Sequence, residues 1–403
     1  MCAASVRGMR ILHTSDWHLG RTFHGCDLLA DQERVLSRLA ALVAEHRVDV
    51  VVVSGDVFDR ALPNAETVRL YDRVLAAISV AGARIVLISG NHDSAARLGS
   101  IRHFAAAGGL HLHTAVETCA EPTVLPDEYG DVAFYGLPYL EPETARVPLG
   151  VPAGGGHAGV LGAAMAAVRR DLATRAAGTR SVVLAHAFVL AGSAREADAQ
   201  TSASERSLSV GGVQTAPADL FDGMDYVALG HLHGCQQPDT ERPWLRYSGS
   251  PLAYSFSETR QRKSVLLAEL DAGGLAAVTR IELPVPRRLA MLTGRLDDLL
   301  HAPAYTAHAE DYLQVVLTDP VRPLDPMRRL HTRFPNAVAV EWRPEAGRPA
   351  ERLEPTRRRR DHDDLSTAAD FVEWVRHSKP TTVERALLAE ALSATRVKQE
   401  RAG

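Results

Sequence analysis

The chain has 403 residues, of which 46% are apolar and 23% charged, and a formal net charge of −4. This composition excludes a wholly disordered chain, and the negative charge excludes a globally basic protein that coats DNA. The length predicts two or three domains, at roughly 150 residues per domain. No apolar run reaches the ~18 residues that cross a bilayer, and because residues 1–10 lack an apolar stretch we do not expect them to be a secretory signal. Because the cysteines Cys2, Cys26, Cys119 and Cys235 form no CxxC pair, we expect neither a disulfide framework nor a cysteine zinc site, and a cytoplasmic protein.

Short apolar runs alternate with helical patterns over the first 270 residues. Helical spacing occupies residues 31–47 and 65–80, and strands separated by helices predict an α/β domain with substantial parallel pairing. Two further runs, at 245–258 and 263–270, are expected to be strands that close the same domain, and residues 191–215 an irregular connection. The runs predicted to be buried strands are residues 10–16, 49–56, 84–93, 132–138, 181–186 and 225–233.

The sequence changes character near Pro284 and Pro286. Beyond them we expect a small α+β module, because strand patterns at 312–319 and 337–342 surround short helical patterns at 296–300 and 326–334. An Arg/Pro-rich stretch then predicts a linker, and helical periodicity returns after it. The expected organisation is a disordered extension at 1–8, a main domain at 9–283, the module at 287–345, the linker at 346–364 and helices at 365–395.

Side chains that bind metals follow the apolar runs at the point where each run ends. Ligands of open α/β sheets bind just beyond the carboxyl ends of the strands, so these side chains are expected to meet in one small volume. We also expect the two members of each pair, Asp16 with His18 and His231 with His233, to face one side, because residues two apart on an extended chain do so. The predicted donors are Asp16, His18, Asp56, Asn91, His186, His231 and His233.

Carboxylate, amide and imidazole donors without a thiolate favour Mn²⁺, Fe or Zn²⁺. Seven ligands are too many for one tetrahedral ion and enough for two ions about 3.5–4 Å apart, the arrangement used for displacement at phosphorus. Asp56, which follows Gly55, is the best candidate for a carboxylate that touches both ions. Each motif alone has a structural alternative, such as a surface turn or a polar strand end. Five motifs in order, each ending an apolar run, favour a shared site.

The complete set of motifs resembles the signature of the calcineurin-like metallophosphoesterases. Within that family, the opening ILHTSDWHLG and the stretches SGDVFD and YSGSPLAYSFSE are similar to the SbcD-type nucleases, the bacterial branch of the Mre-type repair nucleases. The resemblance is strong over residues 9–270 and looser through 287–345 and the C-terminal helices. The motifs are Asp16-x-His18, Gly55-Asp56-x-x-Asp59-Arg60, Gly90-Asn91-His92-Asp93, His186 and Gly230-His231-x-His233.

The resemblance implies a fold and the role of each site residue. The fold is a sandwich of two mixed sheets flanked by helices, with residues 287–345 as a capping domain and helices at the C-terminus. His92 is implied to be the general acid toward the leaving oxygen and Asp59 the residue that orients it. Asp93 is then a turn residue or one that supports the ligands, and Arg60 either matches a position that contacts phosphate in some phosphoesterases or is simply solvated. The implied ligands are Asp16, His18, Asp56 and His233 for the first ion and Asp56, Asn91, His186 and His231 for the second.

The function implied by the resemblance is DNA cleavage dependent on two divalent ions, with Mn²⁺ expected. Such nucleases act as double-strand exonucleases and single-strand or hairpin endonucleases in DNA repair, recombination and replication. The implied partners are DNA and a coiled-coil ABC-type ATPase, which residues 365–395 are expected to bind. A homodimer within a heterotetramer is implied, in the cytoplasm and associated with the nucleoid. The basic clusters Arg287-Arg288 and Arg357–Arg360 are candidates for attracting DNA, or simply solvated.

Two other functions compete with the nuclease. One is a small-molecule or cyclic-nucleotide phosphodiesterase of the same superfamily, which would not need the last 100 residues. The other is a scaffold without activity, against which the complete set of ligands argues. The family begins near Met9, so residues 1–8 are expected to be an extension or the product of an upstream start codon.

Overall fold

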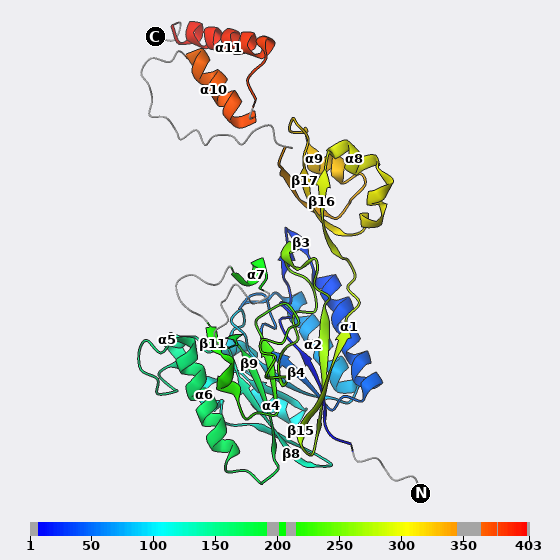
Figure 1. The fold of residues 1–403 in the computed structure, drawn as a ribbon, viewed down its shortest axis with the longest axis vertical. Coiled ribbons are helices and arrows are strands. Elements are labelled where there is room, and N and C mark those ends of the chain that lie inside the picture. Colours follow the sequence, from blue (N-terminus) through cyan, green and yellow to red (C-terminus); the bar gives the residue numbers. More distant parts are fainter. Residues whose placement is uncertain (1–6, 192–200, 207–214, 345–363, 377, 401–403) are drawn as a thin grey trace. The chain divides into compact units, whose positions relative to one another are not determined.

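The computed structural model describes residues 7–191, 201–206, 215–344, 364–376 and 378–400. The chain divides into two compact units, Met1–Ala290 and Met291–Gly403, which Figure 1 shows in colours that follow the sequence. The expected connection at 191–215, the linker at 346–364 with Arg357–Arg360, and the extension at 1–8 lie largely outside the described residues. Among the helices that are described, none is both long and apolar enough to span a membrane.

The first unit contains a six-stranded mixed sheet built around the predicted N-terminal strands. β1, β4, β5 and β6 run parallel, β14 pairs antiparallel with β1, and β15 pairs antiparallel with β14. Parallel strands covered on both faces are nearly continuous apolar runs, as in residues 50–53, where all four residues are valine. The order across the sheet is β15 (Gly274–Glu282), β14 (Ser264–Asp271), β1 (Arg10–Thr14), β4 (Val50–Ser54), β5 (Arg84–Ile88) and β6 (Leu110–His113).

The second sheet has five strands and faces the first. β13, β12, β9 and β8 run parallel, and β7 is antiparallel to β8. One core cluster joins Ile11, Val52 and Ile88 of the first sheet to Phe134 and Leu184 of the second, so the two sheets form a sandwich. The order across this sheet is β13 (Leu245–Tyr247), β12 (Tyr226–Gly230), β9 (Arg180–His186), β8 (Gly130–Leu137) and β7 (Thr123–Asp127).

Helices complete the layers. α1 (Leu29–His46) buries Val35, Leu39 and Leu42 along one face, at the spacing of an amphipathic helix. α2 (Ala65–Val80) packs on α1 and β5, and α6 (Gly156–Leu172) packs on the second sheet (Figure 1). The remaining elements of this unit are β2 (Thr22–Phe23), β3 (Cys26–Asp27), β10 (Phe188–Leu190), β11 (Thr215–Pro217), α3 (Ala95–Leu98), α4 (Arg102–Ala107), α5 (Pro142–Ala145), α7 (Ala203–Arg206), η1 (Val116–Thr118), η3 (Ala218–Phe221) and η4 (Phe256–Glu258).

The predicted α/β sandwich is confirmed, with one wrong strand and several missed elements. Residues 245–258 were expected to form a strand, but only Leu245–Tyr247 do so, as β13. The strand ends because Gly249 adopts a left-handed backbone with φ +77° and Pro251 cannot donate to a sheet. The helix α6 was not predicted, because its sequence is rich in glycine and alanine and begins at three consecutive glycines, Gly154–Gly156, which are typical of a loop. The edge strand β15 was missed because its residues are largely polar or exposed.

The second unit holds a small three-stranded sheet in the order β16-β17-β18, in which β17 and β18 are parallel. Leu299, Leu313, Leu330 and Phe334 are fully buried in it, which matches the α+β module expected there. Thr381 and Glu384 form the predicted capping box, with Thr381 N–H donating to Glu384 Oε2 at 2.7 Å. The elements are β16 (Leu289–Gly294), α8 (Leu296–His301), η5 (Pro303–His308), β17 (Tyr312–Leu317), α9 (Pro326–Leu330), β18 (Ala337–Trp342), α10 (Asp364–Arg376) and α11 (Thr382–Glu400).

A buried ion pair connects the two sheets of the sandwich at the end opposite the carboxyl ends of β9 and β8. The Arg180 guanidinium donates to both carboxylate oxygens of Asp127 in the second sheet, at 2.8 and 2.5 Å. It also donates to the Asp271 carbonyl oxygen at the end of β14 in the first sheet, at 3.2 Å. The side chains of Arg180 and Asp127 are only 3% and 9% exposed. A buried charge that loses its partner is strongly destabilising.

Asp127→Ala is therefore expected to lower the free energy of unfolding by about 3–5 kcal/mol, because it leaves the Arg180 guanidinium buried without a counter-charge. Urea denaturation followed by circular dichroism measures this. Glu143→Ala is the control, since it breaks the exposed pair with Arg146, and should cost less than about 1 kcal/mol. Equal losses for the two variants would contradict this role of the buried pair.

Candidate metal centre

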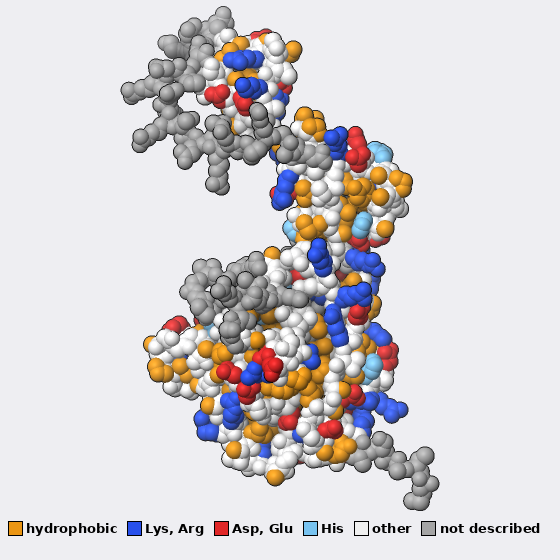
Figure 2. All heavy atoms as spheres, viewed as in Figure 1, with side chains coloured by type: hydrophobic (Ala, Val, Ile, Leu, Met, Phe, Trp, Pro, Cys, Tyr) orange, Lys and Arg blue, Asp and Glu red, His pale blue; other side chains and the backbone are white. Residues whose placement is uncertain are grey.

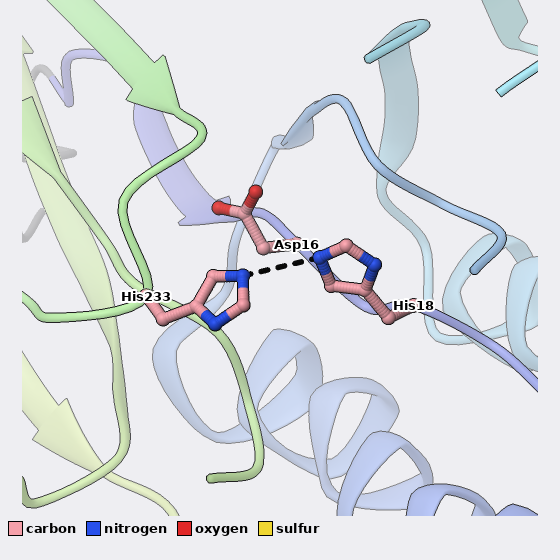
Figure 3. Close-up of side chains that lie close together, drawn as sticks. All are labelled: Asp16, His18 and His233. Carbon is pink, nitrogen blue, oxygen red and sulfur yellow. Dashed lines mark hydrogen bonds between the residues drawn. The ribbon is translucent and has the colours of Figure 1, made fainter. Parts of the chain in front are cut away.

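The carboxyl ends of strands from both sheets meet in one place, as the sequence predicts. β1, β4 and β5 of the first sheet lead to Asp16, Asp56 and Asn91, and β9 and β12 of the second sheet lead to His186 and His231. The side chains of Asp16, His18 and His233 lie close together in Figure 3 although they come from opposite ends of the domain's sequence. All the donors predicted from the sequence belong to this cluster, through the contacts described below.

Four of these donors have a strained main chain. Asp16, His18, Asp56 and His231 have φ of 53°, 45°, 48° and 104°, a region that non-glycine residues rarely adopt at a cost of about 1–3 kcal/mol each. Asp16 and His18 do reach one point, as expected, but not because the chain is extended there. The side chains converge because the main chain twists sharply directly after each strand. Strain that is concentrated in this way is typical of functional sites.

Glycines make room for the donors. A β-carbon on Gly55 would lie 2.4 Å from His186 Nδ1, and one on Gly90 would lie 2.1 Å from Asp56 Oδ1. A β-carbon on Gly230 would lie 1.8 Å from the Ser54 carbonyl oxygen. The glycines that begin three of the five motifs are thus required by the close approach of neighbouring strand ends.

The first group of donors contains Asp16, His18 and His233. The Nε2 atoms of His18 and His233 face each other at 3.1 Å. The Nδ1 atom of His233 lies 3.4 Å from Glu258 Oε1, and that of His18 lies 3.6 Å from Asp59 Oδ1. We assign the protons to Nδ1, where these carboxylates attract them, so both Nε2 atoms present lone pairs. Two lone pairs that face each other beside a carboxylate fit a shared cation.

The second group contains Asp16, Asp56 and His186. His186 Nδ1 donates to the Ser54 carbonyl oxygen at 2.8 Å, so the neutral form of this imidazole carries a lone pair on Nε2. That Nε2 nevertheless faces two acceptors, Asn91 Oδ1 at 3.0 Å and Asp56 Oδ2 at 3.4 Å. His231 Nδ1 lies 3.2 Å from the same Asn91 oxygen. A cation among these atoms would turn the repulsion into coordination.

The charges in the second group favour a cation there. Burial alone would lower the pKa of His186, but the charges of Asp56 and Asp16 raise it to about 9. Burial opposes ionisation of Asp56, yet His186 and His18 hold the pKa of that carboxyl well below its usual value. Without another cation, His186 must carry a proton to balance the carboxylates, which is the charge a metal ion would supply.

Asp56 lies between the two groups. Its Oδ2 is 3.6 Å from His18 Nε2 in the first group and 3.4 Å from His186 Nε2 in the second. Its Oδ1 accepts the His92 main-chain N–H at 2.9 Å. The carboxylate is 3% exposed, so it is held in place on both sides, as a carboxylate that contacts two ions must be.

His92 belongs to neither of these two groups but lies in a third one, with His18 and Asp59, at the edge of the donors. Its Nδ1 donates to the main-chain carbonyl oxygen of Asp59 at 2.9 Å, and its ring packs edge-on against His18. The Asp59 carboxylate is directed elsewhere, with Oδ1 3.2 Å from the Arg21 guanidinium. Asp59 therefore contacts His92 through its main chain, a contact that the spacing of the motif alone did not specify.

The other motif residues have separate positions. The Asp93 carboxylate accepts three main-chain N–H groups, from Val57, Phe58 and Gly90, at 2.8–3.1 Å. These bonds join the two loops that carry Asp56 and Asn91. The Arg60 side chain is 78% exposed, with Nε 3.9 Å from Asp59 Oδ2.

A buried network behind His233 was not predicted from the sequence. Glu258 accepts from Lys263 Nζ at 2.6 Å, and Lys263 also donates to the His233 carbonyl oxygen at 2.9 Å. Burial opposes ionisation of Glu258, but the Lys263 ammonium holds the pKa of this carboxyl well below its usual value. Glu205 accepts the His233 main-chain N–H. The only sequence signal for this network is a lysine directly before the apolar run of β14.

Comparisons with known sequences match most of the chain. Residues 9–147 match the family model described as calcineurin-like phosphoesterase. Residues 285–376 match the model described as type 5 capsule protein repressor C-terminal domain. The chain is 29% identical over 333 residues to the SbcD subunit of the nuclease SbcCD of Staphylococcus saprophyticus, a match that covers 82% of this chain and 84% of the relative.

Two solved structures are similar at a more distant level. The protein TT1561 of Thermus thermophilus has 14% identity and a TM-score of 0.40, covering 68% of this chain and 99% of that one. A dimetal phosphatase from Danio rerio has 13% identity and a TM-score of 0.38, covering 69% and 100%. These likenesses are too remote to carry an argument.

Glu258→Gln is expected to weaken divalent-metal binding by about 10–100-fold. A glutamine has one acceptor oxygen, which the Lys263 ammonium would take. Its amide would then face His233 Nδ1 and place the proton of that histidine on Nε2, where it blocks a metal. Titration calorimetry with Mn²⁺ measures the loss.

Asp56→Asn is the comparison. This variant should reduce Mn²⁺ binding at both positions, because the Asp56 carboxylate lies between the two groups. Thermal unfolding of the metal-free variants checks that each one folds. Unchanged Mn²⁺ affinity in a folded Glu258→Gln protein would show that Glu258 does not orient His233.

Proposed function

We propose that this chain, which belongs to the calcineurin-like metallophosphoesterase family, is a two-metal-dependent DNA nuclease of the SbcCD type. The observation that carries the proposal is the convergence of lone pairs and carboxylates in two adjoining groups. The relationship to the SbcD subunit of the nuclease SbcCD, over 82% of this chain, supports DNA as the substrate. The match of residues 285–376 to a C-terminal family domain extends the relationship beyond the catalytic sandwich.

Two divalent ions, Mn²⁺ by preference, would bind at the converging donors. The imidazoles favour Mn²⁺ over Mg²⁺, which prefers oxygen ligands. When bound, the ions would neutralise charge on the phosphoryl oxygens and acidify the attacking water. The first ion would be held by Asp16, His18, Asp56 and His233, and the second by Asp56, Asn91, His186 and His231.

His92 supplies the proton in this reaction. Attack of the water oxygen on phosphorus forms one P–O bond and breaks another, and the departing oxygen needs a proton. The Asp59 carbonyl oxygen fixes Nδ1–H of His92 at 2.9 Å, which leaves Nε2 to carry the proton that is given to the leaving group. Asp59 orients His92 by this main-chain contact, and its carboxylate holds Arg21 and faces His18.

The competing function is hydrolysis of a small or cyclic phosphodiester. The donors alone would serve either substrate, because both reactions displace an oxygen at phosphorus. The second unit, of more than 100 residues, favours the nuclease. Of the basic clusters, Arg287 already pairs with Asp31 at 3.1 Å and so contributes little free charge for DNA.

His92→Gln is expected to reduce Mn²⁺-dependent cleavage of linear duplex DNA by about 10²–10⁴-fold, because glutamine cannot donate the proton. Metal content should be unchanged, because His92 is not a ligand in this assignment. Cleavage is followed on end-labelled DNA, and bound metal by inductively coupled plasma spectrometry.

The wild-type chain is compared in Mn²⁺, in Mg²⁺ free of Mn²⁺, and on bis(p-nitrophenyl) phosphate. Turnover of the small diester without any cleavage of DNA would favour the competing function. Loss of one ion from the His92→Gln protein would make His92 a ligand and overturn its assigned role.

The C-terminal helices are proposed to bind the coiled coil of an ABC-type ATPase. Phe371 and Trp374 of α10 are each 62% exposed, and Val383 and Leu387 of α11 are 71% and 59% exposed. An Arg376–Glu384 pair joins the two helices at 2.9 Å. Large apolar side chains spaced along helices and left uncovered are typical of helix-in-groove binding.

Replacing Phe371 and Trp374 together by Ala is expected to abolish co-purification with the ATPase, because both anchors are lost. Hydrolysis of bis(p-nitrophenyl) phosphate should be unchanged. Asp370→Ala on the same helix is the control and should bind as the wild type does. Full binding by the double variant would exclude this face as the docking surface.

A homodimer, within a heterotetramer with the ATPase, is the proposed assembly. Ile101 and Phe104 are three residues apart at the start of α4 and are 56% and 88% exposed. Side chains with this spacing lie on one face of a helix. A twofold contact would cover the same apolar face on both copies.

Phe104→Glu is expected to shift the protein from dimer to monomer in light scattering coupled to gel filtration, because it places a charge in the contact. Val80→Glu is the control, since Val80 is 89% exposed at the end of α2. A wild-type monomer, or a Phe104→Glu dimer, would contradict the proposed contact.

A further inference from the structure

A hollow beside the metal centre has no role in the mechanism described above. It has a volume of about 550 Å³ and lies against Gly234 and Cys235, which directly follow His233. Consecutive Cα atoms are 3.8 Å apart, so its wall begins within one or two residues of a proposed ligand. The residues that line it are Thr201, Gly234, Cys235, Ser257, Arg260, Gln261, Arg262 and Arg280.

The lining of this hollow, the arginine pocket, has one sign of charge. Arg260, Arg262 and Arg280 contribute cations, and none of the lining residues is acidic. Its other side chains are small or carry hydroxyl, thiol or amide groups. Both acidic and basic side chains occur on the face of the first unit that Figure 2 shows, and the whole chain has a net charge of −4. The positive charge beside the metal centre is therefore local.

The three arginines differ in what already engages them. Arg280 donates to the Ser264 hydroxyl at 2.9 Å and to the Arg262 carbonyl oxygen. Arg262 forms an exposed pair with Glu282 at 3.2 Å, with side chains 76% and 56% exposed. Arg260 has no hydrogen bond or ion pair with the described part of the chain. Its guanidinium keeps its donors for a ligand.

Buried hydrogen bonds also connect the pocket to the metal centre. Gln261 Oε1 accepts from Lys263 Nζ at 2.9 Å, and the same ammonium holds the His233 carbonyl oxygen and Glu258. Lys263 is 4% exposed, so this connection is buried. An anion bound at the pocket would consequently lie beside the ligands of the first ion, connected to them by this buried network.

We propose that the arginine pocket binds a backbone phosphate of the DNA strand next to the phosphodiester that is cleaved. The inference rests on the proposed nuclease function. Guanidinium groups bind phosphate by charge-assisted hydrogen bonds, and a contact to the backbone serves every sequence equally. The pocket thereby positions a polynucleotide, whereas a substrate with a single phosphodiester cannot reach both places.

The test compares cleavage of a DNA strand with hydrolysis of a small substrate that contains only one phosphodiester. Arg260→Ala should raise the KM for a single-stranded oligonucleotide about fivefold in Mn²⁺, with bis(p-nitrophenyl) phosphate unaffected. The slope of log KM against log salt should fall by roughly 0.7–1, the value of one lost phosphate contact. Arg260→Lys should recover part of the loss. Arg170→Ala, which removes an exposed charge from α6, is the matched control and should change neither quantity.

A second pair of variants tests whether the pocket can be made to bind DNA more tightly. Glu282→Gln removes the carboxylate that competes for Arg262 and should lower the oligonucleotide KM about two- to fivefold. Glu45→Gln makes the same change of charge in another exposed pair, with Arg38, and should have no effect. Equal effects of the two variants would indicate net charge alone and overturn the pocket.

The two proposals can fail separately. A wild-type chain that cleaves bis(p-nitrophenyl) phosphate but not DNA would defeat the nuclease. Fluorescence anisotropy of the labelled oligonucleotide with the metal-free chain still measures the pocket. If Arg260→Ala leaves both KM and the anisotropy affinity unchanged, or alters both substrates equally, the pocket does not bind the strand.

Discussion

Repulsion between converging acceptors is the constraint on which the rest of this structure depends. Imidazole lone pairs 3.1 Å apart are unfavourable in the absence of a cation, and a third imidazole, directed at an amide oxygen and a carboxylate, needs either a proton or a cation. The fold nevertheless holds them together below the surface. Each layer of the sandwich contributes to this, because the donors come from strand ends of both sheets. The apolar core between the sheets, and cations that bind in the folded site, offset the unfavourable free energy of holding these donors together.

The means of holding the donors are local and depend on a few positions. Left-handed main-chain conformations at Asp16, His18 and Asp56 direct side chains into the site, and glycines let neighbouring strand ends approach. Behind the donors, Glu258 and Lys263 keep one imidazole in a single protonation pattern. The arginine pocket shares that buried support, so one network connects the metal centre and the surface expected to meet a polynucleotide.

The sequence allowed prediction of the donors more fully than of their support. Each donor ends an apolar run, and the carboxyl ends of parallel strands meet at one edge, so convergence follows from the pattern. The left-handed turns could not be predicted, because Asp16 and His18 have no glycine to mark them. Residues 245–258 looked like a strand because aromatic residues recur there, yet Tyr254 is directed to the main chain of Trp17. The Glu258–Lys263 pair depends on tertiary packing that local periodicity does not record.

The order of the strands also matters for synthesis on the ribosome. The strand β14, residues 264–271, inserts between β1 and β15, so the edge of β1 stays unpaired in a nascent chain until roughly two thirds of the protein has been made. His231 and His233 also arrive late in translation, as do Glu258 and Lys263, which support His233. An incomplete chain therefore has several donors but neither all the strands of the first sheet nor a complete metal centre. The chain can therefore hydrolyse a substrate only after the first unit is complete. Until then the exposed edge of β1 can pair with other chains, so the nascent protein is most prone to association during this period.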